Sequence, residues 1–476
     1  MTRRIPLAPL DAGFLQLDTT ETPMHVGALL PFAPAPGAPA DHLRQVFDEA
    51  RGLPVASPWN RRLATHWLKR SPVHWWVEED EVDLDHHVRR VALPSPGDER
   101  ELGVMVAQLH SNPLDLSRPP WELHVIEGLA DGRFAIYVKI HHALVDGITG
   151  MKLLARSLST DPDDADTPLF FTLQPRTRGA LREEGVSRGA VAGAVTTAVA
   201  GATGLARTGV GAATAGLRLG RSLARVATAP LRGDDLVGPL QAPHSVLNGR
   251  ITRQRRFATQ QYDLARLKAV STATGTTLND VVLAVCGGGL RTYLQELDAL
   301  PDRPLVGFLP VNVRAEDDPG GGNAVGAVLS SLGTDVADPL ERLRAVHASA
   351  SRAKAQMRGM DQRTAIAYSA AVLAPAGLQA AAAVAGVSLP VATFNVCVSN
   401  VPGPREPLWF RGARLQGVFP LSIPTHGMAL NITLESYADT LAFGFIGCRD
   451  TLPHLQRLAL HTGEALDALE ERVRQG

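Results

Sequence analysis

The sequence predicts an α/β protein built from two domains, because two regions that mix strand and helix patterns flank a low-complexity segment. The chain has 476 residues, which is more than one hydrophobic core usually organises. Residues 1–175 and 248–476 each combine alternating apolar stretches with helical periodicity, whereas residues 176–247 are rich in alanine and glycine. We therefore expect an N-terminal half, a helical or flexible connection, and a C-terminal half.

The N-terminal half carries a strand, a short loop and a helix in succession. Residues 133–140 (RFAIYVKI) alternate and are rich in β-favouring side chains, which predicts a strand. Residues 147–158 (GITGMKLLARSL) have the spacing of a helix. The run HHALVDG, residues 141–147, falls at their junction. Functional residues are common in such loops, so this run is the first candidate site.

The connection between the halves is low in complexity. From about residue 176 to residue 230 the composition shifts to alanine, glycine, threonine and valine with scattered arginine. The segment could be a small-residue helical hairpin or a mobile linker. Each glycine weakens the helical alternative by roughly 1 kcal/mol against alanine.

The C-terminal half again mixes helices and strands. In one helix, Thr277 can cap the start and Asp280 lies in the first turn, where a negative charge favours the helix dipole. The predicted helices span residues 262–273, 277–297, 339–357 and 453–473. The predicted strands span residues 305–313, 393–398, 429–435 and 440–447.

Composition argues against several classes of protein. The net charge is −1, so a strong attraction to nucleic acid or to an anionic membrane is not indicated, and we expect no nucleic-acid partner. The cysteines Cys286, Cys397 and Cys448 are far apart, which fits a reducing, cytoplasmic compartment and argues against a disulfide framework or a zinc site. Pro6 and Pro9 interrupt the apolar stretch near the N-terminus, so no secretory signal is expected.

No membrane-spanning helix is expected. The longest uncharged stretch runs from Thr364 towards Asn400, consists mostly of alanine, glycine and serine, and is broken by Pro375 and Pro390. Because alanine adds little transfer free energy, insertion of this stretch would be weak. Peripheral attachment to a lipid surface stays open.

The HHALVDG run suits general-base catalysis. A hydroxyl is a poor nucleophile near neutral pH, and a neutral imidazole within hydrogen-bond reach can take its proton as the new bond forms. Asp146 can fix the ring or the loop, and Gly147 permits a tight backbone path. Two alternatives remain on spacing alone. A metal site would need a third ligand, which is not close in sequence, and His141 and His142 could simply pack at a strand end.

Other candidate residues favour structural roles. His86 and His87 lie in the alternating stretch EVDLDHHVRR, which predicts a solvated strand or edge. His426 lies in the turn-like segment PTHGM, where a structural role is favoured over a pocket-lining one. The glycines at 287–289 sit in a helical pattern without the residues of a phosphate loop, which indicates close approach of another backbone or of a ligand chain.

A basic cluster begins the C-terminal half. Such clusters are usually solvated faces, but this one could instead meet the phosphates of a carrier such as coenzyme A. Its members are Arg250, Arg253, Arg255 and Arg256.

With these segments in view, the sequence resembles the bacterial bifunctional wax ester synthase/diacylglycerol acyltransferases, within the condensation-domain and chloramphenicol acetyltransferase superfamily. The histidine run alone indicates a resemblance to the superfamily and not to this family in particular. The family resemblance rests on an ordered set of further segments that covers almost the whole chain outside the low-complexity connection. They are PLDAGFL (9–15), PLDLSRPPWELHVIEGL (113–129), TLND (277–280), PVNVR (310–314), GN (322–323), SNVPGP (399–404), PLW (407–409), LNIT (430–433) and SY (436–437).

The resemblance implies a fold and a reaction. The fold would be α/β, with two chloramphenicol acetyltransferase-like halves, mixed sheets and an interdomain channel that holds the active site. The donor substrate would be acyl-CoA, with no cofactor, and the acceptor a long-chain alcohol or diacylglycerol. The product would be a wax ester or a triacylglycerol. With a histidine as general base, we expect direct transfer without a covalent acyl-enzyme.

The resemblance also implies roles for single residues. His142, the second histidine of the motif, is the base. Asp146 is structural and pairs with an arginine instead of relaying protons, with Arg314 as one candidate partner. No metal is implied. The resemblance does not identify the group that stabilises the oxyanion, and Asn279 is only one candidate. The residues implied to support the site are His141, Gly147, Asn279 and Asp280.

Two alternative functions differ in kind from this one. A related acyltransferase or condensation enzyme would use a carrier-protein thioester as donor. A non-catalytic lipid-body coat protein would need an amphipathic surface but no base, so the intact motif argues against it. Because the implied substrates are poorly soluble, a peripheral lipid surface is a further expected partner, with the Ala/Gly-rich connection as one candidate contact.

Overall fold

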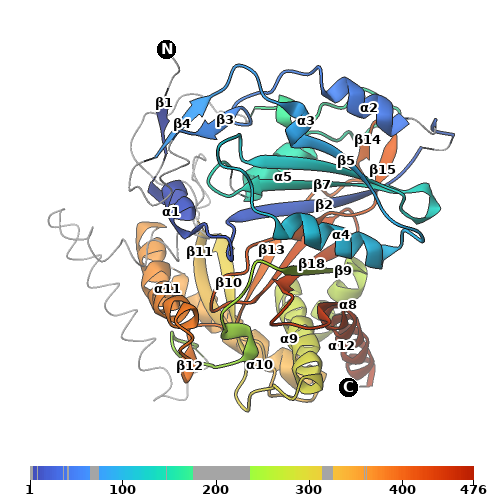
Figure 1. Cartoon of the computed structure of the whole chain (residues 1–476). Helices are drawn as coiled ribbons and strands as arrows, with labels where there is room; N and C mark the ends of the chain where they lie inside the picture. The colour runs from blue at the N-terminus through green and yellow to red at the C-terminus, as the bar shows by residue number, and fades with distance from the viewer. Residues whose placement is uncertain are drawn as a thin grey trace.

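Two large sheets form the frame of the molecule (Figure 1). In Figure 1 the sheet of the N-terminal half lies above that of the C-terminal half. The computed structural model describes residues 4–7, 9–35, 37–39, 42–64, 74–145, 147–174, 236–312, 325–358, 360 and 362–475. The fold class is therefore α/β with mixed sheets, as predicted.

The N-terminal half contributes most of the upper sheet and the helices around it. Its helices are α1 (Pro9–Leu17), α2 (His42–Ala50), α3 (Leu84–His87), α4 (Glu99–Ser111) and α5 (Gly147–Ala155), with 3-10 turns at Ala130–Gly132 and Phe170–Thr172. Its strands are β1 (Arg4–Pro6), β2 (His25–Ala33), β3 (Arg61–Leu63), β4 (Trp75–Glu78), β5 (Val88–Ala92), β6 (Trp121–Glu127) and β7 (Phe134–His141). Strands β1, β4 and β3 form a small separate sheet.

Strand β7 runs through the middle of the upper sheet. It pairs antiparallel with β2 on one side and β6 on the other, and all eight of its residues are buried. Because side chains alternate between the two faces of a strand, Ile136 and Val138 join the core beneath α2, whereas Tyr137 and Lys139 point to the face that carries α4.

The C-terminal half forms the lower sheet and its helices. The helices are α8 (Leu264–Thr274), α9 (Leu278–Glu296), α10 (Pro339–Met357), α11 (Gln362–Val384) and α12 (Leu455–Gln475), with a 3-10 turn at Val246–Asn248. The strands are β8 (Ala242–Pro243), β9 (Arg255–Asp263), β10 (Val306–Asn312), β11 (Val325–Ser331), β12 (Val391–Ala392), β13 (Val396–Val401), β14 (Trp409–Phe410), β15 (Ala413–Leu415), β16 (Phe419–Leu421), β17 (Leu430–Tyr437) and β18 (Thr440–Cys448).

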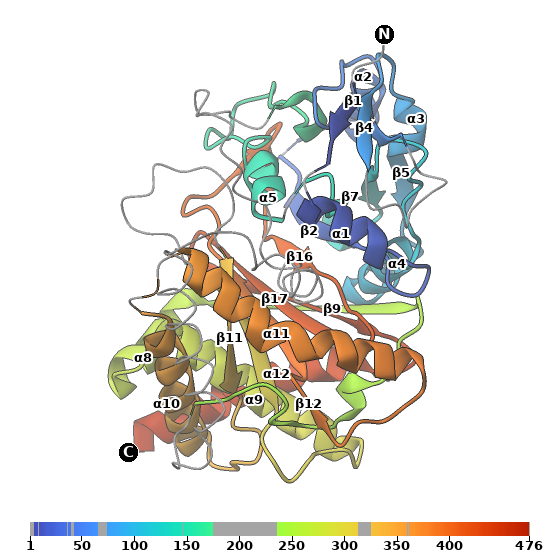
Figure 2. The same cartoon turned by 90° about the vertical axis from the view of Figure 1, so that its left-hand side faces the viewer.

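The lower sheet has the order β11-β10-β13-β17-β18-β9, and it is mixed. β10, β13 and β17 run parallel to one another, and the other pairs are antiparallel. Helices α8, α9, α10 and α12 lie below it in Figure 1, and α11 crosses in front of it in Figure 2. The large apolar core of this half fills the space between the sheet and these helices.

Three short strands of the C-terminal half join the upper sheet and tie the halves together. The upper sheet has the order β14-β15-β2-β7-β6-β5, and β16 also pairs with β2. β16 passes over Gly444 of β18 so closely that a Cβ there would lie 1.9 Å from the carbonyl oxygen of Pro420. A side chain at this position is therefore excluded. These three strands place segments far apart in sequence within one sheet.

The triple glycine of α9 confirms the predicted close approach, and its neighbours are protein backbone and side chains. A Cβ on Gly287 would lie 2.0 Å from the carbonyl oxygen of Leu332, and one on Gly289 would lie 2.6 Å from the hydroxyl of Thr462. The glycines thus let α9 pack directly against Leu332, which follows β11, and against α12.

Most predicted elements of the C-terminal half are confirmed, with small shifts. The helix predicted at 339–357 is α10, and Thr277 and Asp280 form a reciprocal capping box at the start of α9. The expectation that Pro375 breaks its stretch is wrong, because α11 continues through it. The strand predicted at 393–398 begins only at Val396.

Helix α11 is unusual for its composition. Within the described residues, Thr364–Val384 is the one stretch long and apolar enough to cross a membrane by length and composition, and 39% of it is buried inside the protein. Core helices of water-soluble proteins pass the same test. The finding is therefore weak evidence for a membrane span.

Candidate active site

The histidine run lies where the sequence placed it, between a central strand and a helix. His141 is the last residue of β7, and α5 begins at Gly147. The backbone N–H of His141 donates to Pro120 at 2.9 Å, and that of His142 donates to Met24 at 2.9 Å. The sheet therefore holds the backbone at both histidines.

His141 has a structural position. Its side chain is 1% exposed, and its Nδ1 accepts a hydrogen bond from the N–H of Ala143 at 3.1 Å. A ring nitrogen that accepts carries no proton, so the proton of the neutral ring sits on Nε2. That nitrogen lies 4.0 Å from Oδ1 of Asp18. His141 thus stabilises the turn that follows it.

His142 presents its ring to a phenyl ring. The imidazole stacks on Phe14 of α1 with ring centroids 4.1 Å apart and an interplanar angle of 13°. Phe14 is 1% exposed, whereas His142 is only half-buried. The second histidine of the run, and not the first, therefore has a fixed ring that remains partly accessible.

A buried charged network supports β7 two residues before the motif. The ammonium of Lys139, 0% exposed, donates to the carbonyls of Leu109 and Asn112 at the end of α4, both at 3.0 Å. It also lies 3.0 Å from Oε2 of Glu122, which accepts a hydrogen bond from His124 at 3.1 Å. Burial raises the pKa of Glu122, but hydrogen bonds from His124 and Lys139 outweigh it and bring the pKa to about 2.

Two further histidines lie beside the motif in neutral form. His25 is the cross-strand neighbour of His141, and its Nε2 donates to the carbonyl of His110 at 2.8 Å. Nδ1 of His110 lies 2.7 Å from the hydroxyl of Tyr137. Burial, reinforced by nearby positive charge, lowers the pKa of both histidines well below the ordinary value. Together these contacts link β2, β7 and α4 around the motif.

Two of the predicted site residues, Asp146 and Arg314, lie outside the described residues. Gly147 is the first residue of α5, and a Cβ there would meet nothing within 4 Å. Its φ also lies outside the left-handed region. The described surroundings therefore leave room for a side chain at this position, and the supporting role of Gly147 stays a prediction.

Asn279 and Asp280 lie in the first turn of α9, in the other half of the molecule. Oδ2 of Asp280 accepts hydrogen bonds from the N–H of Thr277 at 3.0 Å and from Nδ1 of His347 at 2.7 Å. Asp280 is 1% exposed, and Asn279 is half-buried. The observed partners of Asp280 all belong to the C-terminal half, so its contacts here secure α9 to α10.

The expected solvated strand is wrong for His86 and His87, and it begins only after them, at Val88 of the edge strand β5. The two histidines end the short helix α3, with Asp83 as its N-cap. His87 is 1% exposed, stacks on Trp121 at 4.6 Å and hydrogen-bonds to its carbonyl at 2.8 Å, and burial lowers its pKa to about 4. Burial against Trp121, which no local pattern reveals, outweighs the polar appearance of this stretch.

The structural role expected for His426 is confirmed. Its Nδ1 accepts the N–H of Ile251 at 3.2 Å, and its Nε2 lies 3.4 Å from Glu21. Glu21 also pairs with Arg250 at 2.8 Å, and its carbonyl accepts a hydrogen bond from Arg255, which is 3% exposed. These two arginines join the halves, so they do not form a free basic surface.

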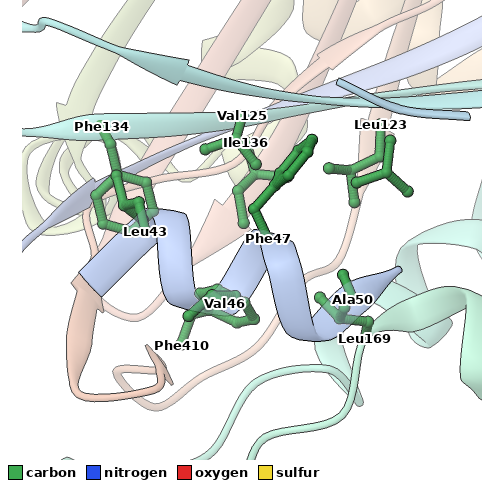
Figure 3. Close-up of a pocket in the computed structure, with 11 residues that line it drawn as sticks. Leu43, Val46, Phe47, Ala50, Leu123, Val125, Phe134, Ile136, Leu169 and Phe410 are labelled. Carbon is green, nitrogen blue, oxygen red and sulfur yellow. The ribbon is translucent and has the colours of Figure 1, made fainter. Parts of the chain in front are cut away.

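An apolar pocket lies under α2, on the face of the upper sheet opposite α4 (Figure 3). Its lining is entirely apolar and includes Phe47, Val125 and Ile136. It holds about one water-sized sphere and would stay dry. It is too small for a fatty acyl chain.

Sequence reasoning missed several residues around the motif. Phe14, Lys139 and Glu122 are far from it in sequence or look like ordinary alternating strand positions. The signal for Lys139 was a charge in the otherwise apolar run FAIYVKIH. Within the described residues, no three His, Cys, Asp or Glu side chains come together to hold a metal ion.

Comparison with known proteins identifies close relatives. Residues 7–282 match the family model of the wax ester synthase/diacylglycerol acyltransferase catalytic domain, and residues 321–470 match that of the WS/DGAT C-terminal domain. A Mycobacterium tuberculosis protein named as a diacylglycerol O-acyltransferase is 55% identical over 97% of this chain and 96% of its own length. O-acyltransferase WSD of Acinetobacter baylyi is 38% identical over 98% of this chain and 97% of its own length.

Solved structures give the same result. The wax ester synthase/diacylglycerol acyltransferase from Marinobacter aquaeolei VT8 is 39% identical, with a TM-score of 0.77 over 98% of this chain and 99% of that one. The first condensation domain of the CDA synthetase is 17% identical, with a TM-score of 0.53 over 99% of this chain and 96% of that one. The second likeness shows a shared fold alone.

Proposed function

The chain belongs to the wax ester synthase/diacylglycerol acyltransferase family and is an acyltransferase, and from this premise we propose that His142 is the general base of its reaction. The proposed donor is a fatty acyl-CoA, and the proposed acceptor is a long-chain alcohol or diacylglycerol. The observation that carries the proposal is the position of His142: its backbone is held by Met24, its ring is held by Phe14, and the ring remains half-buried at the end of β7.

The proposed reaction is a direct transfer. His142 takes the proton of the acceptor hydroxyl as the oxygen attacks the thioester carbonyl. The C–O bond forms, the C–S bond breaks, and the protonated imidazole returns its proton to the departing thiolate. Asn279 remains the candidate donor to the oxyanion, and an Asp146–arginine pair, with Arg314 as candidate, is proposed to hold the loop.

The cysteines give little support to a covalent alternative. Burial raises the pKa of Cys286 and of Cys397 to about 12, which leaves almost no thiolate near neutral pH. Cys448 is also buried, and its sulfur accepts from the N–H of Thr252 at 3.5 Å. Burial raises the pKa of Cys448, but hydrogen bonds from Thr451 and Thr252 outweigh burial and lower it. The pKa argument against a covalent intermediate therefore applies to Cys286 and Cys397, and mass spectrometry tests Cys448.

Two measurements test the proposed reaction. Release of free coenzyme A from palmitoyl-CoA should depend on added hexadecanol or diolein, and the same acyl group on an acyl carrier protein should react poorly. Intact-protein mass spectrometry after mixing with palmitoyl-CoA alone should show no added acyl group. Preference for the carrier-protein donor would replace the proposed substrate, and an acylated enzyme that turns over would overturn direct transfer.

We also propose that the protein works at a lipid surface from the cytoplasmic side. The predicted contact in the Ala/Gly-rich connection lies outside the described residues. Among those described, the end of α11 offers an alternative: Leu378 is 66% exposed, Val384 is 47% exposed, and Val387 just beyond it is 55% exposed. No charged residue occurs from residue 364 to residue 404. An uncharged apolar face suits insertion among lipid headgroups.

A further inference from the structure

Phe14 and His142 form one packed unit at the candidate site. Their rings lie nearly parallel, 4.1 Å apart. Phe14 is 1% exposed and belongs to an apolar cluster with Leu15, Met24 and Trp76. The backbone N–H of His142 donates a hydrogen bond to the carbonyl of the same Met24. Neither ring can turn far without repacking this cluster.

We propose that Phe14 is a positioning residue for the base. Its ring sets the plane of the His142 imidazole, and its face stabilises the imidazolium that forms when His142 takes a proton. This inference rests on the proposed function, in which His142 is the base.

The stabilisation follows from the charge distribution of an aromatic ring. The face of the ring is partially negative and attracts a cation that lies within about 6 Å of its centroid. The separation of 4.1 Å is well inside that range. Phe14 also keeps water from one face of the imidazole, and leucine or methionine at this position would exclude the same water without the attraction of the ring. Interactions of this kind change a proton affinity by roughly two- to fivefold.

Several charged or titratable groups surround the motif, and replacement of Phe14 leaves all of them in place. Phenylalanine itself carries no titratable group. A change in the pH dependence of the Phe14 variants therefore reports on the ring and not on a lost charge. Among the described residues these groups are Asp11 on α1, Asp18 just after it, His25 on β2, Lys139 and His141 on β7, and Lys152 on α5.

The test compares pH profiles of kcat/KM for the full-length protein with palmitoyl-CoA and a short soluble alcohol. Phe14→Leu and Phe14→Met remove the ring, and Phe14→Tyr keeps it. Without the ring, the limb on which activity rises with pH should move to lower pH by roughly 0.3–0.7 unit. The plateau of kcat should fall about tenfold with little change in KM for the thioester. Phe14→Tyr should keep both the position of the limb and the plateau of kcat close to those of the wild type.

A neighbouring core residue provides the matched control. Leu15→Val removes one methylene group from the same cluster and keeps the Phe14 ring, so it should leave the limb in place. If the ring-free variants keep the wild-type limb, or if Leu15→Val moves it equally, Phe14 is only a core residue. Failure of the proposed function is distinguishable, because a folded His142→Gln protein would then keep its activity whatever the Phe14 variants do.

Discussion

At Glu435 the fold buries a carboxyl group that has no counter-charge among the described residues. The side chain, on β17, is 2% exposed, and its Oε2 has no hydrogen-bond partner among the described residues. It lies against Gly403, where an added Cβ would come within 2.9 Å of its Oε1. Burial alone raises the pKa of Glu435 from 4.5 to about 8. The carboxyl is therefore neutral at pH 7, like the buried histidines of the other half.

The raised pKa predicts a loss of stability with rising pH. The unfolded chain releases the proton near pH 4.5, whereas the folded chain keeps it until about pH 8. The contribution of the protonated Glu435 to the free energy of unfolding is therefore complete below pH 4.5. It decreases between pH 4.5 and pH 8, by at most about 1.4 kcal/mol per pH unit. Glu435→Gln removes this dependence. In urea unfolding, the free energy of unfolding of the variant minus that of the wild type should increase steadily from pH 5.5 to pH 8.

An exposed glutamate serves as the control for that series. Glu81, in a loop of the N-terminal half, is exposed, and Glu81→Gln should follow the wild type at each pH. If the difference between Glu435→Gln and the wild type stays constant across the range, the buried carboxyl does not hold its proton. The explanation by burial would then be wrong.

Single residues also show where sequence reasoning ends. The role of His142 follows from its place in a short motif, and the structure adds its ring partner Phe14. Lys139 and Glu122 occupy strand positions that alternation would leave half-exposed, yet both are buried because α4 and the C-terminal half cover that face. Which face of a strand is covered is decided by segments distant in sequence, so no local pattern could reveal this pair.

At the scale of elements, local signals explain the predictions that succeeded. α9 and α10 have capping residues and clear periodicity, and both begin within one residue of the expected start. The short strands β14, β15 and β16 were not predicted, because two or three residues carry no periodicity. Their pairing with β2 depends on contacts across almost the whole chain.

Helix α11 carries the prediction that belongs to this scale. Leu378→Asp and Val384→Asp place charges on its exposed apolar end, where insertion into lipid would have to bury them. Both variants should float with vesicles of phosphatidylcholine and diolein at least about tenfold less than the wild type. They should also lose activity on emulsified diolein while keeping activity on a short soluble alcohol.

A residue on another helix provides the matched control for flotation. Leu460 of α12 is 55% exposed, and Leu460→Asp should float like the wild type. If the α11 variants also float like the wild type, this surface does not contact lipid. If they lose a dimer in light scattering while flotation is unchanged, a second copy of the chain covers the surface instead.

At the scale of the whole molecule, the candidate site depends on the joining of two halves. α4 packs on β9, β16 crosses β18 at Gly444, and Glu21 pairs with Arg250 across the same boundary. The end of β7 is therefore held from both halves. Composition and length predicted two α/β halves. That β14, β15 and β16 of the C-terminal half join the upper sheet came only from the structure.

The activity of a His142→Gln protein is the most direct test of the central claim. Glutamine keeps a polar side chain against Phe14 but cannot act as a base near neutral pH. With palmitoyl-CoA and hexadecanol, kcat should fall by about 10²–10⁴-fold while circular dichroism and thermal unfolding stay close to those of the wild type. Near wild-type turnover by the folded variant would contradict the assignment of His142 as the general base.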